Sequence, residues 1–368
     1  MSERITQVDL ARDAAASGAW RDAYRLLSSI DGSGLGAEDL EHLADAAWWL
    51  SRFDESFEVR RRAYASFAAS GDDLGAGRAA TRLCIEHFLR QEAAVAGGWL
   101  KRAERHLHDL PEASEQGFLA VVQATVARFG GDLNAASRLS QRATQIGRRL
   151  ADRDLVAMGI HTEGLVRIAA GDVEEGVALL DEAMTSVVAG ELSDYFTGAV
   201  YCNVLDACLG LADLRRAGEW NDAARAWCES LPPDSPYPGF CRVNRAEVAA
   251  LRGSWSEAEA EAMRAAEELM RVNPMNAAPA FYEAGEIRRR MGDAGGAEEA
   301  FARARELGLE PQPGLALLRL QQGKVEAAGR GLKTASAAAA GSPLRRATLL
   351  GAMVEVALAA GDLDAATT

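Results

Sequence analysis

Positive charge, cysteine, proline and aromatic residues are all scarce in this 368-residue sequence. Lys and Arg number 40 against 54 Asp and Glu, which gives a formal net charge of −14. Proteins that hold duplex DNA need basic surfaces, so specific DNA binding by this chain alone is not expected. The short basic runs, residues 60–62 and 288–290, are interpreted as solvated helix faces.

The five cysteines include no CxxC pair and are odd in number, which argues against a disulfide framework and for a reducing, cytoplasmic setting. No run of 18 apolar residues is present, so no membrane span is predicted. The amino terminus has no apolar segment of the kind a signal peptide needs. We therefore expect a cytoplasmic protein that does not enter the membrane.

Recognisable catalytic and metal-binding motifs are also missing. There is no G-x-S-x-G sequence, and the Gly-rich stretches at 32–36 and 329–334 have the wrong spacing for phosphate loops. His106 and His108 are two residues apart, which points them to different sides of a helix. The sequence predicts no catalytic residue, no metal site and no cofactor. An enzyme is the least favoured of three interpretations.

A repeated pattern of small residues fills the chain instead. A turn residue is followed five positions later by Ala or another small residue, as in Gly292 with Ala297 and Ala304. Ten such turns occur, spaced 31 to 41 residues apart, at Gly18, Ser51, Gln91, Gly131, Gly171, Ala212, Gly253, Gly292, Gly323 and Gly361. A nearly constant period close to 40 indicates a helical repeat array whose unit is somewhat longer than the tetratricopeptide unit of about 34 residues.

Helix packing explains the pattern. Two antiparallel helices approach closely only where side chains are small, and Gly at the turn supplies the left-handed conformation that ends the first helix. Asp directly after Gly131, Gly171, Gly292 and Gly361 can cap the second helix. No strand alternation competes with this pattern. We predict an all-α fold, a right-handed α-solenoid of tetratricopeptide-like helix hairpins with about ten turns, forming one domain over residues 1–368 with no separate catalytic or DNA-binding domain.

Two details refine this prediction. The four prolines in residues 231–239 predict a loop between hairpins, and residues 311–314 predict a second break. Trp48 and Trp49 are adjacent, so only one is expected to face the core and the other a groove or the next repeat.

The first helix of each hairpin should line the concave surface of such a solenoid. Counting back three, six and ten residues from the turns selects a mixed polar and apolar lining, which suits a small molecule or a partner helix. The candidate effector-binding residues are His161, Asp206, Glu247, Tyr282, Glu286 and Arg289. For any single one of them, contact with a neighbouring repeat or with water is an equally good explanation.

From about residue 160 to 335, with a shorter match at 97–103, the sequence resembles actinobacterial LuxR-type transcriptional regulators that carry a tetratricopeptide-like region ahead of a helix-turn-helix. The matching stretches include residues 179–184 (LLDEAM), 189–193 (AGELS), 213–217 (DLRRA) and 311–320 (PQPGLALLRL). The chain departs from the family at Pro238, Asn244 and Glu283, where the resemblance leads us to expect Arg, His and Gln.

The resemblance implies a sensor region that binds a small-molecule or protein effector in its groove and acts on DNA only through a C-terminal domain outside this chain. No recognition-helix pattern occurs in the sequence, and the helix beginning at Leu363 is cut short by the end at Thr368, so we expect the native protein to continue. The alternative is a stand-alone tetratricopeptide protein-interaction scaffold. The sequence leaves a homodimer open and does not identify the effector.

Overall fold

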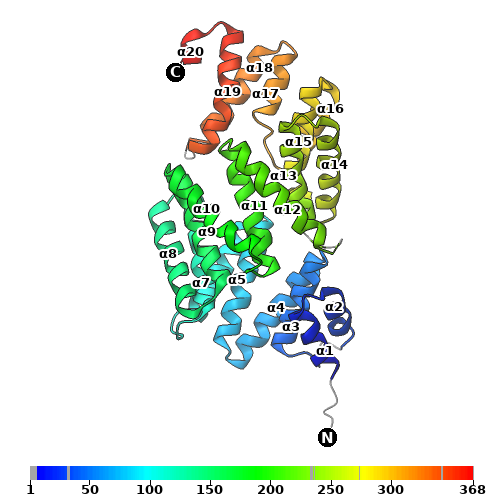
Figure 1. The fold of residues 1–368 in the computed structure, drawn as a ribbon, viewed down its shortest axis with the longest axis vertical. Coiled ribbons are helices and arrows are strands. Elements are labelled where there is room, and N and C mark those ends of the chain that lie inside the picture. Colours follow the sequence, from blue (N-terminus) through cyan, green and yellow to red (C-terminus); the bar gives the residue numbers. More distant parts are fainter. Residues whose placement is uncertain are drawn as a thin grey trace. The chain divides into compact units, whose positions relative to one another are not determined.

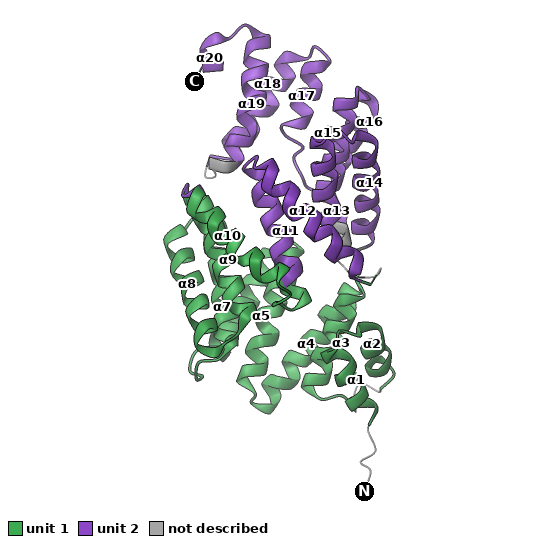
Figure 2. Cartoon of the chain, in the orientation of Figure 1, with its two compact units in different colours: residues 1–170, 174–196, 232–236 green, residues 171–173, 197–231, 237–368 purple. Residues whose placement is uncertain are grey.

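A computed structural model describes residues 6–30, 34–232, 235, 237–272, 274–340 and 343–367. In these residues every regular element is a helix, and successive helices pair as antiparallel hairpins (Figure 1). The all-α hairpin array predicted from the sequence is therefore confirmed. The chain divides into two compact units, each described by itself (Figure 2).

Unit 1 comprises residues 1–170, 174–196 and 232–236. Its helices are α1 (Gln7–Ala16), α2 (Trp20–Ser28), α3 (Ala37–Trp49), α4 (Phe53–Ser70), α5 (Asp73–Leu89), α6 (Ala93–Leu107), α7 (Ser114–Phe129), α8 (Leu133–Leu150), α9 (Arg153–Ala170) and nearly all of α10 (Val173–Val188). The first turn of α11 (Asp194–Gly210) also belongs to unit 1.

Unit 2 comprises residues 171–173, 197–231 and 237–368. It contains the rest of α11, then α12 (Leu214–Ser230), α13 (Tyr237–Leu251), α14 (Trp255–Val272), a short 3-10 helix (Pro274–Ala277), α15 (Ala278–Met291), α16 (Ala294–Glu306), α17 (Gly314–Gln321), α18 (Val325–Ala338), α19 (Pro343–Ala360) and α20 (Leu363–Thr367). Whether the units form one continuous solenoid stays a prediction.

The ten predicted hairpin turns are all present. Each of the ten turn residues has a positive φ, including the three that are not glycine, Ser51, Gln91 and Ala212, with φ of 56°, 60° and 56°. This left-handed conformation ends the first helix of each hairpin. The side chains of Asp132, Asp293 and Asp362 then accept a hydrogen bond from the backbone N–H three residues later, at 2.9, 2.9 and 3.0 Å.

Small residues lie where the helices of a hairpin cross. A Cβ added to Gly164 would lie 2.8 Å from the backbone oxygen of Gly176, and one added to Gly285 would lie 2.6 Å from the Phe301 ring. The predicted alanines at this seam, such as Ala136 and Ala297, are fully buried. The repeat pattern therefore arises from backbone approach within each hairpin.

The two breaks differ in outcome. In the first break, predicted over residues 231–239, residues 233, 234 and 236 lie outside the described residues. The predicted loop is too long, because α13 begins at Tyr237 and includes Pro238. Proline fits the first turn of a helix, where its missing N–H would have no intrahelical partner. The second break is confirmed, since residues 307–313 separate α16 from α17, although Gly314 already begins α17.

Candidate functional site

Five of the six predicted site residues lie close together in unit 2. Asp206 is on α11, Glu247 on α13, and Tyr282, Glu286 and Arg289 on α15. The three residues on α15 share one face because they are four and three positions apart. The charges of Asp206 and Glu286 both act on Glu247, and that of Glu247 acts on Tyr282. That these residues bind an effector stays a prediction.

Arg289 and Glu286 form a buried, two-pronged ion pair. The Nε of Arg289 donates to Oε1 of Glu286 at 2.9 Å, and its Nη2 donates to Oε2 at 3.1 Å. Arg290 adds a third contact to Oε2 at 3.3 Å. Since Glu286 and Arg289 are only 5% and 9% exposed, the interpretation of residues 288–290 as a solvated face is wrong for Arg289.

Tyr282 borders this pair on the same helix. Its ring centroid lies 5.8 Å from that of Phe301 on α16. Burial and the negative charges of Glu286 and Glu283 raise the pKa of the Tyr282 hydroxyl well above its usual value, so it stays protonated. A Cβ added to Gly314, the first residue of α17, would lie 2.4 Å from Oε1 of Glu286, so glycine lets α17 approach the carboxylate.

Glu283 belongs to the same group, although the helix-face count did not select it. Its side chain is 7% exposed, and among the described residues its carboxyl makes no hydrogen bond or ion pair. Burial, together with the charges of Glu247 and Glu286, raises the pKa of Glu283 to about 8, although Arg290 opposes the shift. We call Asp206, Glu247, Glu283 and Glu286 the acidic cluster. The departure from the LuxR-type pattern at this position was the sequence signal that could have found it.

Within the acidic cluster, Glu247 lies between Asp206 of α11 and the carboxyl groups of α15 in the sense that charges from both sides act on it. Burial, then the negative charge of Asp206, raise the pKa of the Glu247 carboxyl, and Glu286 acts in the same direction. Arg290 is the cation that opposes the shift at both Glu247 and Glu283. Two guanidinium groups, those of Arg289 and Arg290, thus lie among four carboxyl groups from three helices, and both are already paired with Glu286.

His161, the sixth predicted residue, lies on α9 in unit 1. Its side chain is 2% exposed, and neither ring nitrogen has a hydrogen-bond partner among the described residues. Burial, together with the nearby positive charge of Arg128, lowers the pKa of His161 to about 4. His161 is therefore a neutral, buried imidazole at physiological pH.

A second charged network lies in unit 1 and was not predicted. Arg60 is completely buried, and its Nε donates to Glu86 at 2.7 Å while its Nη2 donates to Asp45 at 2.9 Å. Arg82 reaches Asp45 at 3.5 Å, and its guanidinium lies 3.8 Å from the centre of the Tyr195 ring. Arg60 therefore does not belong to a solvated face, and that interpretation of residues 60–62 is wrong for it.

Aromatic rings surround this network. Trp48 contacts Tyr195 edge-on at 5.1 Å between ring centroids, and Trp49 stacks on Trp20 at 5.6 Å. Both tryptophans are buried, at 7% and 5% exposure, so neither faces open solvent, and each packs on a ring from a different helix. Adjacent side chains point to different sides of a helix, and α3 has a neighbour on both sides.

Three cysteines from three helices of unit 2 also meet. The thiols of Cys202 on α11 and Cys228 on α12 lie within hydrogen-bonding reach of Cys241 on α13. These contacts and burial raise the pKa of the Cys241 thiol well above its usual value. A protonated, buried thiol is a poor nucleophile, so Cys241 has the properties of a core residue.

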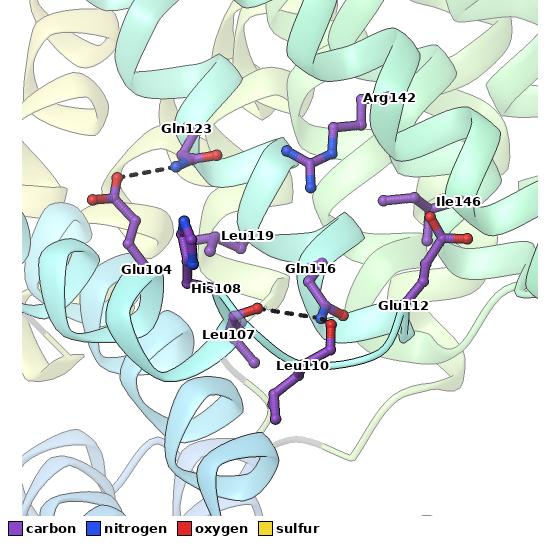
Figure 3. Close-up of a pocket in the computed structure, with 10 residues that line it drawn as sticks. All are labelled: Glu104, Leu107, His108, Leu110, Glu112, Gln116, Leu119, Gln123, Arg142 and Ile146. Atoms are coloured by element: carbon purple, nitrogen blue, oxygen red, sulfur yellow. Dashed lines mark hydrogen bonds between the residues drawn. The ribbon is translucent and has the colours of Figure 1, made fainter.

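A pocket of about 510 Å³ opens in unit 1 where α6, α7 and α8 adjoin (Figure 3). Two of its polar side chains bond to each other, with Gln123 donating to Glu104 at 3.0 Å, and Gln116 donates to the carbonyl oxygen of Pro111 at 3.0 Å. The lining consists of Glu104, Leu107, His108, Leu110, Glu112, Gln116, Leu119, Gln123, Arg142 and Ile146. None of the predicted site residues lines this pocket.

Among the described residues, no group of three or more His, Cys, Asp or Glu side chains has a geometry that could hold a metal ion. No helix in the part of the chain that the structure describes is long and apolar enough to cross a membrane.

Comparison with known proteins gives likeness in structure alone. No protein-family model matches the chain, and no curated protein matches it in sequence. A solved structure of a Rap protein complexed with Competence and Sporulation Factor is similar, with a TM-score of 0.62, 13% identity, and coverage of 90% of this chain and 94% of that one. A chain of the APC/C hetero-tetramer Cut9–Hcn1 gives a TM-score of 0.46 and 11% identity, covering 94% and 83%. At such identities the likeness to Rap supports a tetratricopeptide-like helical repeat fold and nothing further.

Proposed function

We propose that this chain is the sensor region of a bacterial LuxR-type transcriptional regulator and that it binds an effector at the acidic cluster and the adjoining Tyr282 and Arg289. The effector is a protein, a peptide or a small molecule, and its binding is relayed to a DNA-binding domain outside this chain. The observation that carries the proposal is Glu283, a buried carboxyl without a partner among the described residues, beside three more carboxyl groups.

Such a group is not explained by folding alone. Burying a carboxyl without a compensating partner destabilises a protein by several kcal/mol unless the group stays protonated. The hairpin seams are formed by Ala and Gly and need no acid in this place. Groups with strongly shifted pKa values, kept despite their cost to stability, concentrate at binding and catalytic sites.

The LuxR-type assignment rests on the ordered sequence resemblance over residues 160–335. The position of Glu283 fits it in one respect, because a departure from the family pattern falls inside the acidic cluster. An amide at this position would donate and accept hydrogen bonds without charge, whereas a carboxyl adds an acid. We therefore infer that this chain recognises an effector different in charge from that of the regulators it resembles.

A binding screen tests the site. The purified chain is exposed to metabolite and peptide libraries, and ligands are detected as an increase in melting temperature. We expect hits whose affinity falls about tenfold or more in Tyr282→Phe or Arg289→Gln, because a site of desolvated polar groups loses much of its energy when one is removed. Lys333→Gln, an exposed change in the same unit, is the control. Hits that all three variants bind equally well would contradict the proposed site.

The link to transcription has its own test. The reading frame beyond Thr368 should encode a helix-turn-helix, and the full-length regulator should bind its promoter with an affinity that the effector changes. The chain alone should show no sequence-specific binding to the same duplex at physiological salt, because its net charge is −14. A stop codon at that point would instead favour the protein-interaction scaffold.

A further inference from the structure

The pocket at α6, α7 and α8 in unit 1 has a rim that is held in place (Figure 3). The linker from α6 to α7 forms part of it. Gln116 fixes this linker by donating to the carbonyl oxygen of Pro111 at 3.0 Å and by accepting from the N–H of Ala113 at 2.8 Å. Glu112 of the same linker accepts two hydrogen bonds from Arg149 of α8, at 2.7 and 2.6 Å. Walls that are ordered before binding reduce the conformational entropy lost when a ligand enters.

Arg142 on α8 is a lining residue that makes no hydrogen bond or ion pair to any described residue. The other ionisable side chains of the lining all have partners, at 2.7, 2.7 and 2.6 Å: Glu104 with Lys101, His108 with Asp109, and Glu112 with Arg149. In Figure 3 the guanidinium of Arg142 points into the pocket, toward the amide of Gln123. The pocket therefore contains a positive charge that no described side chain pairs with, and its N–H donors are available to a ligand.

Apolar side chains lie beside Arg142 in the same lining. Leu107 of α6, Leu119 of α7 and Ile146 of α8 come from all three helices. Ile146 is one helical turn after Arg142 on α8, and Leu119 is one turn before Gln123 on α7, so each shares a face with its polar neighbour. A ligand that reaches the guanidinium thus also contacts apolar surface. The volume of about 510 Å³ is in the range of small-molecule sites.

We propose that this pocket is a binding site for a monocarboxylate with an apolar body. The guanidinium of Arg142 donates two parallel hydrogen bonds to the carboxylate, a geometry that arginine forms well. Gln123 uses one amide hydrogen on Glu104, at 3.0 Å, and its second amide hydrogen is a further donor. The apolar body lies on Leu119 and Ile146. This site goes beyond the proposed function, because it shares no residue with the site in unit 2.

The charge of the lining favours a monoanion over other ligands. Glu104 and Glu112 are already offset by Lys101 and Arg149. Arg142 supplies one further positive charge, which a single carboxylate neutralises. A phosphate monoester carries about two negative charges, so it would leave an excess of negative charge beside two glutamates. A cationic ligand is disfavoured as well, because the unpaired guanidinium repels it.

Two sources carry this chemistry, a free carboxylic acid and the C-terminal carboxylate of a peptide. The experiment uses one probe for each: phenylbutyrate, and the peptide acetyl-Gly-Ala-Leu with a free C-terminus. The matched neutral probes are the corresponding primary amides, which have nearly the same shape and no charge. Dissociation constants are measured by ligand-observed NMR titration of the purified chain near physiological salt, so that the overall charge of −14 is screened.

We expect at least one of the two acids to bind about tenfold or more tightly than its amide, because the amide forms no ion pair with Arg142. Arg142→Gln should weaken the binding of that acid by about tenfold or more. Arg138→Gln is the matched control, because it removes an exposed arginine one turn earlier on α8 that does not line the pocket, and it should change the dissociation constant by less than about twofold. Which acid binds identifies the source of the carboxylate.

Three outcomes would overturn the inference: equal affinity for the acids and their amides, equal effects of Arg142→Gln and Arg138→Gln, or no binding of either acid up to millimolar concentration. Gln123→Glu gives a second measurement, since a carboxylate added beside Arg142 should compete with the ligand and abolish its binding, and circular dichroism checks that each variant folds. Failure here leaves the site in unit 2 untouched, and failure of the screen for that site leaves this pocket untouched, because the two share no residue.

Discussion

Replacing Glu283 by Gln should stabilise the protein in alkaline solution. The folded state holds the Glu283 proton up to a pH of about 8, whereas the unfolded chain releases it near the ordinary value of 4.5. Between these two pH values the unfolded state binds fewer protons than the folded state, so the free energy of unfolding falls as the pH rises. The wild type therefore loses stability from about pH 4.5 to about pH 8 through this one group.

The size of the effect follows from the shift. A change in pKa from 4.5 to about 8 corresponds to at most about 5 kcal/mol in the free energy of unfolding at pH 9. Gln has the shape of the protonated acid and does not titrate, so Glu283→Gln should match the wild type near pH 5 and exceed it at pH 9. The melting temperature at pH 9 should rise by on the order of 10 °C.

Thermal melts followed by far-UV circular dichroism from pH 5 to pH 9 measure this difference. The groups that act on Glu283 are Glu247, Glu286 and Arg290, and they are unchanged in the variant. Glu326→Gln, at an exposed side chain, controls for the change in net charge. Melting curves of Glu283→Gln and the wild type that stay parallel over the whole pH range would show that Glu283 titrates normally, and the argument for a buried protonated acid would be lost.

Three further predictions concern the scaffold. Arg60→Ala should lower the free energy of unfolding, measured in urea melts, by about 3–5 kcal/mol because it leaves the buried Glu86 carboxylate without its cation. The double variant Arg60→Met with Glu86→Leu should recover much of that stability, and a double variant as unstable as Arg60→Ala would contradict this. Gly164→Ala should destabilise the folded protein by about 1–3 kcal/mol, because the added Cβ clashes with backbone, whereas Gly97→Ala, whose added Cβ has no heavy atom within 4 Å, should stabilise it by up to about 1 kcal/mol. Changes of the same sign in both variants would contradict close backbone approach at Gly164. As the pH falls from 6.5 to about 4, the wild type should lose at most about 3 kcal/mol of stability, because His161 takes up a proton in the unfolded chain but not in the folded state. His161→Leu should not show this loss, and identical acid melts of the two proteins would contradict the prediction.

The sequence predicts the hairpins well because their cause is local. A left-handed turn and small residues at fixed distances from it are needed by every hairpin, so the requirement recurs ten times and becomes visible as a period. Even Gln91 and Ala212, which are unusual residues at such turns, have positive φ as their phase demands. Position in the repeat, not residue type, was the decisive information.

The charged networks could not be predicted in the same way, because their partners are far apart in the sequence. Arg60 pairs with Glu86, which is 26 residues away on another hairpin. Helical periodicity says which face a residue occupies, but which side chains meet across two hairpins depends on the crossing of those helices. For the same reason the count found Glu286 and missed Glu283, since it selected residues by distance from a turn and not by their neighbours on α13.

Helix α15 shows how one helix can serve both the scaffold and the site. Ala284 and Ile287 pack in an apolar cluster with Ala258 of α14 and Ala300 of α16, and Gly285 lies under the Phe301 ring. Glu283, beside these residues in sequence, is not one of the apolar residues of that seam and belongs to the acidic cluster. A substitution there changes a charge beside the seam while the hairpin keeps its apolar packing. In a repeat array each unit is stabilised mainly by its neighbours, so such a change at one first helix leaves the other seams unaffected. This separation of the seam from the acidic cluster explains how the hairpin pattern of α15 and α16 persists although Glu283 is an acid.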